Sequence, residues 1–175
     1  MNDATATLRI LPADSAELLA TLWEQTFRRA YAHLHSPANM DAYCAQAFTV
    51  AAAEAVLNDP RASCRVAWRE QQPVGLSVLL HDAACPVTLA GSASELKQLY
   101  VLPSEYGSGL GRQLFEQARS TAGEAQRQWL WLCVVNINQR AQRFYGKLGC
   151  AVAGSGPVLA LGTDRLTSTI MTIRC

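Results

Sequence analysis

The first third of the chain carries apolar residues at helical spacing, preceded by one short apolar run. Thr7–Leu11 is that run and predicts a strand. Asp14 is a candidate N-cap for a first helix, because its side chain can accept a hydrogen bond from the free amides of the first turn. Ser36 before a proline and Thr49 before the Ala-rich Val50–Leu57 predict two further helix starts. The apolar positions of the first helix are Leu18, Leu19, Leu22, Trp23 and Phe27.

The pattern then changes to apolar runs rich in β-branched residues. Cys64–Trp68 and Val74–Leu80 are two such runs, and the short polar segment between them predicts a hairpin. A third run, Glu95–Leu102, follows a connection of small residues and ends at a proline. Trp129–Val135 is apolar without interruption, as expected of a strand that is covered on both faces.

Two helices and two more strands are also predicted, with the first helix between Glu95–Leu102 and Trp129–Val135. The first helix follows a Gly-rich turn and has its apolar positions at Leu110, Leu114, Phe115 and Ala118. Asn138 opens the second helix, whose apolar face consists of Ala141, Phe144, Tyr145 and Leu148. The last strands are expected around Val158–Leu161 and Leu166–Ile173. Residues 1–175 are therefore expected to form one domain of the α/β (mixed α+β) class, with a single sheet between helices.

Composition narrows the class of protein. The 175 residues include 15 basic and 14 acidic side chains, a balance that argues against a nucleic-acid partner. No stretch reaches the roughly 18 to 20 apolar residues of a membrane span, and the first nine residues contain no apolar core of a signal peptide. The six cysteines are scattered without a Cys-x-x-Cys pair, which favours reduced thiols over disulfides or a zinc site. A cytoplasmic protein without membrane contact or bound metal is expected.

The segment with the strongest chemical signal lies between Glu95–Leu102 and the helix that follows. Its glycine loop consists of Gly107, Ser108, Gly109, Leu110 and Gly111. Glycines allow positive φ angles and let a ligand approach the backbone amides closely. The first turn of the helix adds free N–H groups and the positive end of its dipole, and Arg112 adds a fixed charge. The loop therefore suits a phosphate or pyrophosphate group; the alternative is a tight strand-to-helix turn that binds nothing.

Spacing excludes two common nucleotide-binding motifs at this loop. The dinucleotide motif G-x-G-x-x-G fails because Arg112 stands where its last glycine is required. The nucleoside-triphosphate loop fails because no Gly-Lys-Ser/Thr sequence follows. A phosphate ligand at this loop would belong to another class of molecule.

A second segment, Trp129–Cys150, has the order strand, Asn138, N-x-x-A-x-x-F-Y helix and K-x-G. Together with the glycine loop it resembles the GNAT superfamily of acyl-CoA-dependent N-acetyltransferases. The family writes its pyrophosphate loop Q/R-x-x-G-x-G/A, and residues 106–111 match both glycines but begin with Tyr106. The later motif is matched at Asn138, Ala141, Phe144 and Tyr145. The resemblance implies the GNAT fold, a mixed and mostly antiparallel sheet flanked by helices, with acetyl-CoA as co-substrate.

Three further details are similar to the PaiA-like branch of this superfamily. They are the glutamate that opens E-L-K-Q-L-Y-V, the aromatic-rich Phe27–Tyr43, and the tail L-A-L-G-T-D-R-L-T-S-T-I-M. The branch usually carries G-D-D-x-Q-T-D in its tail, and here Thr163, Leu166 and Ser168 replace an Asp, the Gln and the last Asp. The similarity implies a polyamine acceptor such as spermidine or spermine, although two acidic positions of the tail are lost.

The resemblance also implies roles for single residues. Tyr145 is the candidate acid toward the coenzyme sulfur, with a core aromatic as the alternative, and Glu95 is the candidate base acting through water, with a solvated carboxylate as the alternative. Asn138 holds the pantetheine chain or only caps its helix, and Lys147 meets a coenzyme phosphate or only complements the helix C-terminus.

The glycine loop and Arg112 are expected to bind the diphosphate of the coenzyme. The acetyl carbonyl and pantetheine arm are expected at the backbone of a strand that splays from its neighbour at a bulge, at Leu99, Tyr100 and Val101.

The acceptor pocket is expected between the N-terminal helices and the tail. Tyr31, His33 and His35 are its candidate lining residues, and either histidine is an alternative base. Two histidines without a third ligand make a weak metal site. The same fold could instead acetylate a protein, peptide, amino-acid or drug amine, and a non-catalytic acyl-CoA-binding sensor is the alternative from another class. The apolar last strand offers an edge at which a homodimer could form.

Overall fold

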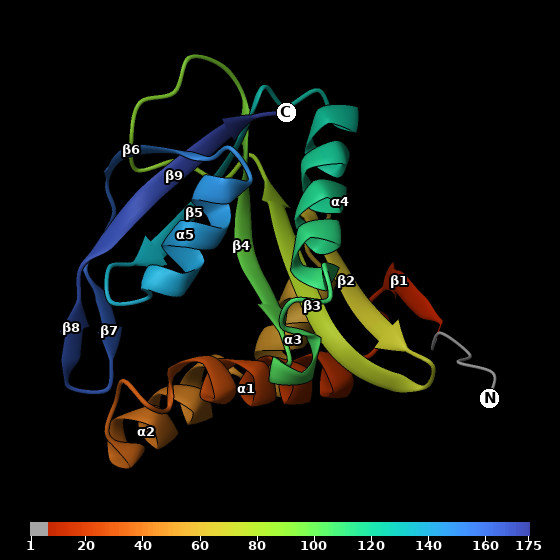
Figure 1. Ribbon diagram of the computed structural model, residues 1–175, viewed down its shortest axis with the longest axis vertical. Helices are drawn as coiled ribbons and strands as arrows, with labels where there is room; N and C mark the ends of the chain where they lie inside the picture. Colours follow the sequence, from red (N-terminus) through yellow and green to blue (C-terminus); the bar gives the residue numbers. More distant parts are fainter. Residues whose placement is uncertain (1–6) are drawn as a thin grey trace.

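One sheet of seven strands runs through the part of the chain that the structure describes, with helices packed on both faces (Figure 1). The structure is a computed structural model and describes residues 7–175, so the expectation about a leader segment falls partly outside it, at residues 1–6. The helices are α1 (Ala16–Tyr31), α2 (Pro37–Ala47), α3 (Val50–Leu57), the short 3₁₀ helix η1 (Pro103–Glu105), α4 (Leu110–Glu124) and α5 (Gln139–Lys147). The strands are β1 (Leu8–Pro12), β2 (Ala62–Arg69), β3 (Gln72–His81), β4 (Ala93–Val101), β5 (Trp129–Val135), β6 (Ala151–Ser155), β7 (Leu159–Leu161), β8 (Asp164–Leu166) and β9 (Ser168–Arg174). The described residues thus form the expected α/β architecture, a mixed and mostly antiparallel sheet flanked by helices.

The order of the strands in the large sheet is β1-β2-β3-β4-β5-β9-β6, and β4 and β5 are its parallel pair. They pair only from Ala93 to Glu95 on β4 and from Trp129 to Trp131 on β5, and then diverge. On its other side, β4 keeps its pairing with β3 up to Val101, with a bulge at Lys97. The splay expected of this strand is therefore confirmed, and it opens the sheet at its centre.

Two layers of apolar side chains hold the helices on the sheet. On one face, α1, α2 and α3 pack against β2 and β3, with Trp23 and Phe27 buried among them. On the other face, α4 and α5 cover β4, β5 and β9, with Phe115 fully buried. Successive residues of a strand point to opposite faces, so Leu130, Leu132 and Val134 of β5 all reach the second layer. Helices therefore cover both faces of the sheet.

Short polar side chains begin most of the helices, as the sequence indicates. Ser36 and Thr49 accept hydrogen bonds from backbone amides at the starts of α2 and α3, and both predictions are confirmed. At α1 the prediction is wrong by one residue, because Ser15 rather than Asp14 accepts the bond from the amide of Leu18. α4 differs from the others, since its N-cap is Gly109 and no side chain caps it.

The C-terminal strands differ most from the expectation. Residues 151–155 form the unpredicted edge strand β6, while β7 and β8 make a separate two-stranded sheet. Gly162, at a φ of 59°, turns this hairpin. The expected last strand is interrupted at Thr167, between the end of β8 and the start of β9. Because β9 lies between β5 and β6, the expectation that this strand offers a free edge for a homodimer is wrong.

All six cysteines lie in the described part of the chain and are free thiols. Burial raises the pKa of the Cys64 thiol to about 11, and Cys44 and Cys150 are also buried. None of the helices described between residues 7 and 175 is both long and apolar enough to cross a membrane.

Candidate active site

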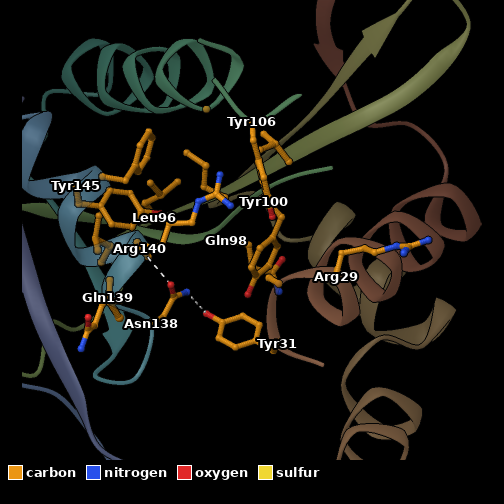
Figure 2. A pocket seen from close by; sticks show the side chains of 18 of the residues that line it. Arg29, Tyr31, Leu96, Gln98, Tyr100, Tyr106, Asn138, Gln139, Arg140 and Tyr145 are labelled. Carbon is orange, nitrogen blue, oxygen red and sulfur yellow. Dashed lines mark hydrogen bonds between the residues drawn. The ribbon is translucent and has the colours of Figure 1, made fainter. Parts of the chain in front are cut away.

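The diverging ends of β4 and β5 open a cavity of about 690 Å³ (Figure 2). Its walls come from the end of α1, the outer half of β4, the glycine loop, β5 and the first turns of α5. The structure brings these predicted site residues together on its walls: Tyr31, His33, Leu99, Tyr100, Val101, Gly107, Gly109, Gly111, Arg112, Asn138 and Tyr145. The other predicted residues lie outside its lining: His35, Glu95, Ser108, Leu110 and Lys147.

The glycine loop presents backbone to one end of this cavity. Gly107 and Gly109 have φ angles of 84° and 87°, in the left-handed region that side chains disfavour. A Cβ atom built on either glycine would meet no atom within 4 Å, so the space in front of the loop is open. The first intrahelical bond of α4 runs from the amide of Gln113, and the amides of Gly111 and Arg112 precede it. An open cradle of amides at a helix N-terminus fits a diphosphate group.

A buried carboxylate braces the loop from behind. Glu105 is only 5% exposed, and its two oxygens accept hydrogen bonds from Arg69 on β2 at 2.8 and 2.7 Å. Hydrogen bonding to Arg69 is the main reason why the pKa of Glu105 is lowered. The hydroxyl of Ser108 lies 2.9 Å from the same carboxylate and accepts a bond from the amide of Leu110. Ser108 and Leu110 therefore support the loop from inside.

Tyr145 reaches the cavity from α5. Its ring is 8% exposed and packs against the rings of Phe115 and Phe144, with centroids 5.9 and 5.0 Å away. Burial raises the pKa of Tyr145, so its hydroxyl stays protonated near neutral pH. That hydroxyl makes no hydrogen bond to any residue between positions 7 and 175, and it is available as a proton donor.

Asn138 joins two walls of the cavity. Its Oδ1 accepts a hydrogen bond from the amide of Ala141 at 3.0 Å, which is the expected N-cap of α5. Its Nδ2 donates to the hydroxyl of Tyr31 at 2.9 Å (Figure 2). Burial raises the pKa of Tyr31, opposed by this hydrogen bond. The same side chain thus begins α5 and ties it to the end of α1.

Glu95 and Lys147 lie off the cavity. Glu95 sits where β4 is still paired on both sides, opposite Leu80 and Trp131. Burial raises the pKa of Glu95, and the charge of Lys97 opposes that effect. Since Glu95 does not line the cavity, its carboxylate can exchange a proton with a group in the cavity only through another group that lies between them. Lys147 is exposed in the last turn of α5.

His35 does not line the cavity and instead contacts the C-terminal tail. Its side chain is 1% exposed, and Nδ1 lies 2.7 Å from Oδ2 of Asp164 on β8. Nε2 is buried and has no partner within the described residues. Close by, Oδ1 of Asn39 accepts hydrogen bonds from the amide and hydroxyl of Thr163. These contacts fasten the start of α2 to the β7–β8 hairpin.

Several residues of the cavity wall escaped the sequence analysis, and two of them have polar side chains that matter for the site. Gln98 follows the bulge at Lys97, and its Oε1 is buried without a hydrogen-bond partner among the described residues. Arg140 places its guanidinium over the ring of Tyr106, with Cζ 3.3 Å from the ring centroid. The N-x-x-A-x-x-F-Y motif leaves position 140 unspecified, and the resemblance implies a bulge without giving its position, so neither residue could be identified from the sequence.

Comparisons with known proteins agree with this geometry. A sequence model described as the acetyltransferase (GNAT) family matches residues 17–150. The chain is 30% identical over 140 residues to an uncharacterized N-acetyltransferase of Mycobacterium bovis. The matched segment covers 80% of this chain and 85% of that protein.

Two solved structures illustrate the similarity of fold. The PaiA N-acetyltransferase from Thermoplasma acidophilum in complex with coenzyme A superposes with a TM-score of 0.78 at 16% identity, over 97% of this chain and 99% of that one. The ribosomal-protein-S18-alanine N-acetyltransferase from Escherichia coli gives a TM-score of 0.64 at 20% identity, over 96% and 94%.

Proposed function

The chain belongs to the acetyltransferase (GNAT) family, and from this membership we propose that its cavity passes acetyl from acetyl-CoA directly to a primary amine. The observation that carries the proposal is the divergence of β4 and β5 beyond Glu95 and Trp131. An inner strand normally pairs on both sides, so the backbone groups of β4 that face the departing β5 lose their strand partners. Leu99, Tyr100 and Val101 are the residues that this leaves beside the cavity.

The glycine loop is the proposed site of the coenzyme diphosphate. Open space lies in front of Gly107 and Gly109, and the first amides of α4 and the Arg112 side chain stand beside it. Backbone amides at a helix N-terminus favour an anion by both hydrogen bonding and dipole. From there, the pantetheine arm runs along β4 toward Tyr145, past Asn138.

Two proton transfers accompany the reaction. A primary amine with a pKa near 10 is almost wholly protonated at pH 7, and freeing its lone pair costs about 4 kcal/mol. We assign the removal of that proton to Glu95. Because its carboxylate does not line the cavity, Glu95 acts through a water molecule. Tyr145 donates toward the sulfur of the departing coenzyme, since its hydroxyl is protonated and without a partner among the described residues. The proton that Tyr145 gives up is replaced by the second proton of the attacking nitrogen, which becomes positively charged when it adds to the thioester.

The charged residues of the cavity wall indicate which kind of amine the cavity accepts. A polyamine needs carboxylates for its second and third ammonium groups, and the only acidic residue on the described lining is Glu105, which Arg69 already engages. The basic residues of the wall are Arg29, Lys97, Arg112 and Arg140. Tyr31 and Tyr100 offer aromatic faces to a single ammonium group. We therefore propose an acceptor with one amine and no second positive charge, with a polyamine as the alternative.

Thiol release from acetyl-CoA across matched amines tests this assignment. Butylamine and phenylethylamine are compared with putrescine and spermidine, and with an amino acid and a peptide. A monoamine is expected to exceed spermidine in kcat/KM by about tenfold or more, which corresponds to about 1.4 kcal/mol of repulsion and desolvation. A preference for spermidine would replace the monoamine by the polyamine. Calorimetric binding of acetyl-CoA without thiol release from any amine would instead indicate a sensor.

A pH profile of the Glu95→Gln variant tests the proposed base. Burial raises the pKa of Glu95, so its carboxylate loses its charge at a higher pH than usual, and the comparison is made above that point. At pH 7 the variant depends on the scarce free amine and is expected to lose about 100-fold in kcat. The ratio to the parent should approach one near pH 10, where the amine is free. Glu54→Gln, at an exposed position on α3, is the matched control. A loss that is constant with pH would remove Glu95 from this role.

A further inference from the structure

Arg140 connects opposite walls of the cavity through an aromatic contact. It lies in the first turn of α5, directly after β5, whereas Tyr106 lies at the start of the glycine loop, after β4. The Cζ atom of Arg140 stands 3.3 Å from the centroid of the Tyr106 ring, so the guanidinium covers the face of that ring (Figure 2). Both residues line the cavity. The side chain therefore crosses the space beside the glycine loop.

The charge of Arg140 is not neutralised by this contact. No ion pair among residues 7–175 includes Arg140, although other arginines of the chain are paired with carboxylates. A guanidinium over an exposed ring is held weakly, and Tyr106 is 38% exposed. A phosphate oxygen binds the same group more strongly, because both partners are charged and the guanidinium can donate two parallel hydrogen bonds. An anion that enters beside the loop would therefore draw Arg140 away from the ring.

The glycine loop itself has no charged side chain at its first position. Tyr106 has a hydroxyl but no positive charge, so it cannot neutralise a phosphate there. Glu105, its neighbour, already binds Arg69 and repels an anion rather than attracting one. Arg140 brings a cation to this same place from the opposite wall. The position of its guanidinium, rather than its place in the sequence, identifies it.

We propose that Arg140 is a coenzyme-binding residue that rests on Tyr106 and transfers to the diphosphate of acetyl-CoA when the coenzyme enters. The proposal rests on the proposed function, because it presumes that the glycine loop receives this diphosphate. Binding replaces a contact between cation and ring by hydrogen bonds to phosphate, which also tie α5 to the loop across the bound coenzyme.

Calorimetry with acetyl-CoA on the whole chain tests the proposal through Arg140→Ala. The variant is expected to bind acetyl-CoA 10- to 100-fold more weakly than the parent. S-acetylpantetheine lacks the diphosphate, so its kcat/KM as acetyl donor should not change. Arg143→Ala is the matched control, because Arg143 is exposed on the same helix and does not line the cavity. Tyr106→Leu removes the resting place and is expected to bind acetyl-CoA at least as tightly as the parent.

Several results would overturn the proposal. They are an unchanged affinity in Arg140→Ala, an equal loss for S-acetylpantetheine, or an equal loss in Arg143→Ala. A loss in Tyr106→Leu as large as that in Arg140→Ala would also contradict it, since the ring would then act on the bound state. Failure of the parent protein itself to bind acetyl-CoA would instead contradict the proposed function of the loop.

Discussion

The Tyr145→Phe variant is expected to bind acetyl-CoA as tightly as the parent and to turn it over about 10²- to 10³-fold more slowly. The substitution removes only the hydroxyl, and the ring keeps its packing against Phe115 and Phe144. Burial raises the pKa of Tyr145, so the lost group is a protonated donor at every working pH. Coenzyme affinity comes from the glycine loop and the backbone of β4, which the change does not touch. Calorimetry and steady-state kinetics on the same preparation separate the two quantities.

Tyr43→Phe is the control for this variant. Tyr43 also packs against Phe27 in an aromatic cluster, but it does not line the cavity, and its kcat should not change. The thermal midpoint of Tyr145→Phe should not fall, because the missing hydroxyl has no hydrogen-bond partner among the described residues. If kcat of Tyr145→Phe stays within about twofold of the parent, another group supplies the proton. Tyr100 would be tested next, since its pKa is also raised by burial beside the cavity.

The parts of the fold that the sequence predicted correctly are those with local causes. Ser36, Thr49 and Asn138 each cap a helix with their own side chain, and the partner amide lies three residues on. The uninterrupted apolar run at Trp129–Val135 needs only its own length and composition to indicate a covered strand. The glycine loop is also local, because the positive φ at Gly107 and Gly109 favours glycine whatever packs nearby.

The parts that could not be predicted depend on the register between distant segments. The resemblance implies a bulge in β4, but not its position at Lys97, which arises from pairing with β3 and turns Gln98 toward the cavity. No feature of the strand's own residues indicates that extra position. In the same way, His35 meets Asp164 across 129 positions, and Arg69 braces the glycine loop from β2. β6 was missed because it has only five residues, which are small and mostly exposed and show no alternation of apolar and polar positions.

In the candidate site, too, local features could be predicted from the sequence, whereas contacts between distant segments could not. Gly109 and Tyr145, which the motifs match, line the cavity, because each motif fixes a helix and its start, whereas Lys147 of the K-x-G segment does not line it. Glu95 was chosen by its place in a strand, and its distance from the cavity follows from where β4 and β5 part. Arg140 became visible only when the loop after β4 was placed against the helix after β5.

Gly109→Val is expected to weaken binding of acetyl-CoA about 100-fold in calorimetry. Gly109 has a φ of 87°, and a Cβ atom there projects into open space in front of the loop. The valine would occupy that space and keep a phosphate from the amides, and loss of two charge-assisted hydrogen bonds at about 1.5 kcal/mol each gives this factor. A side chain at positive φ also strains the backbone by about 1 to 3 kcal/mol. Stability and affinity should both fall, and a control must separate them.

Gly149→Val provides that separation. Gly149 has nearly the same φ, 91°, at the end of α5, and a Cβ atom there would make an ordinary contact with Ile173. It does not line the cavity, so its substitution should lower the thermal midpoint by a similar amount while leaving the affinity for acetyl-CoA unchanged. Gly109→Ala, with less crowding, should bind acetyl-CoA about tenfold more weakly than the parent. Equal affinities in the Gly109 and Gly149 variants would mean that strain, and not occupancy of the cradle, governs binding, and the loop would lose its assignment as the diphosphate site.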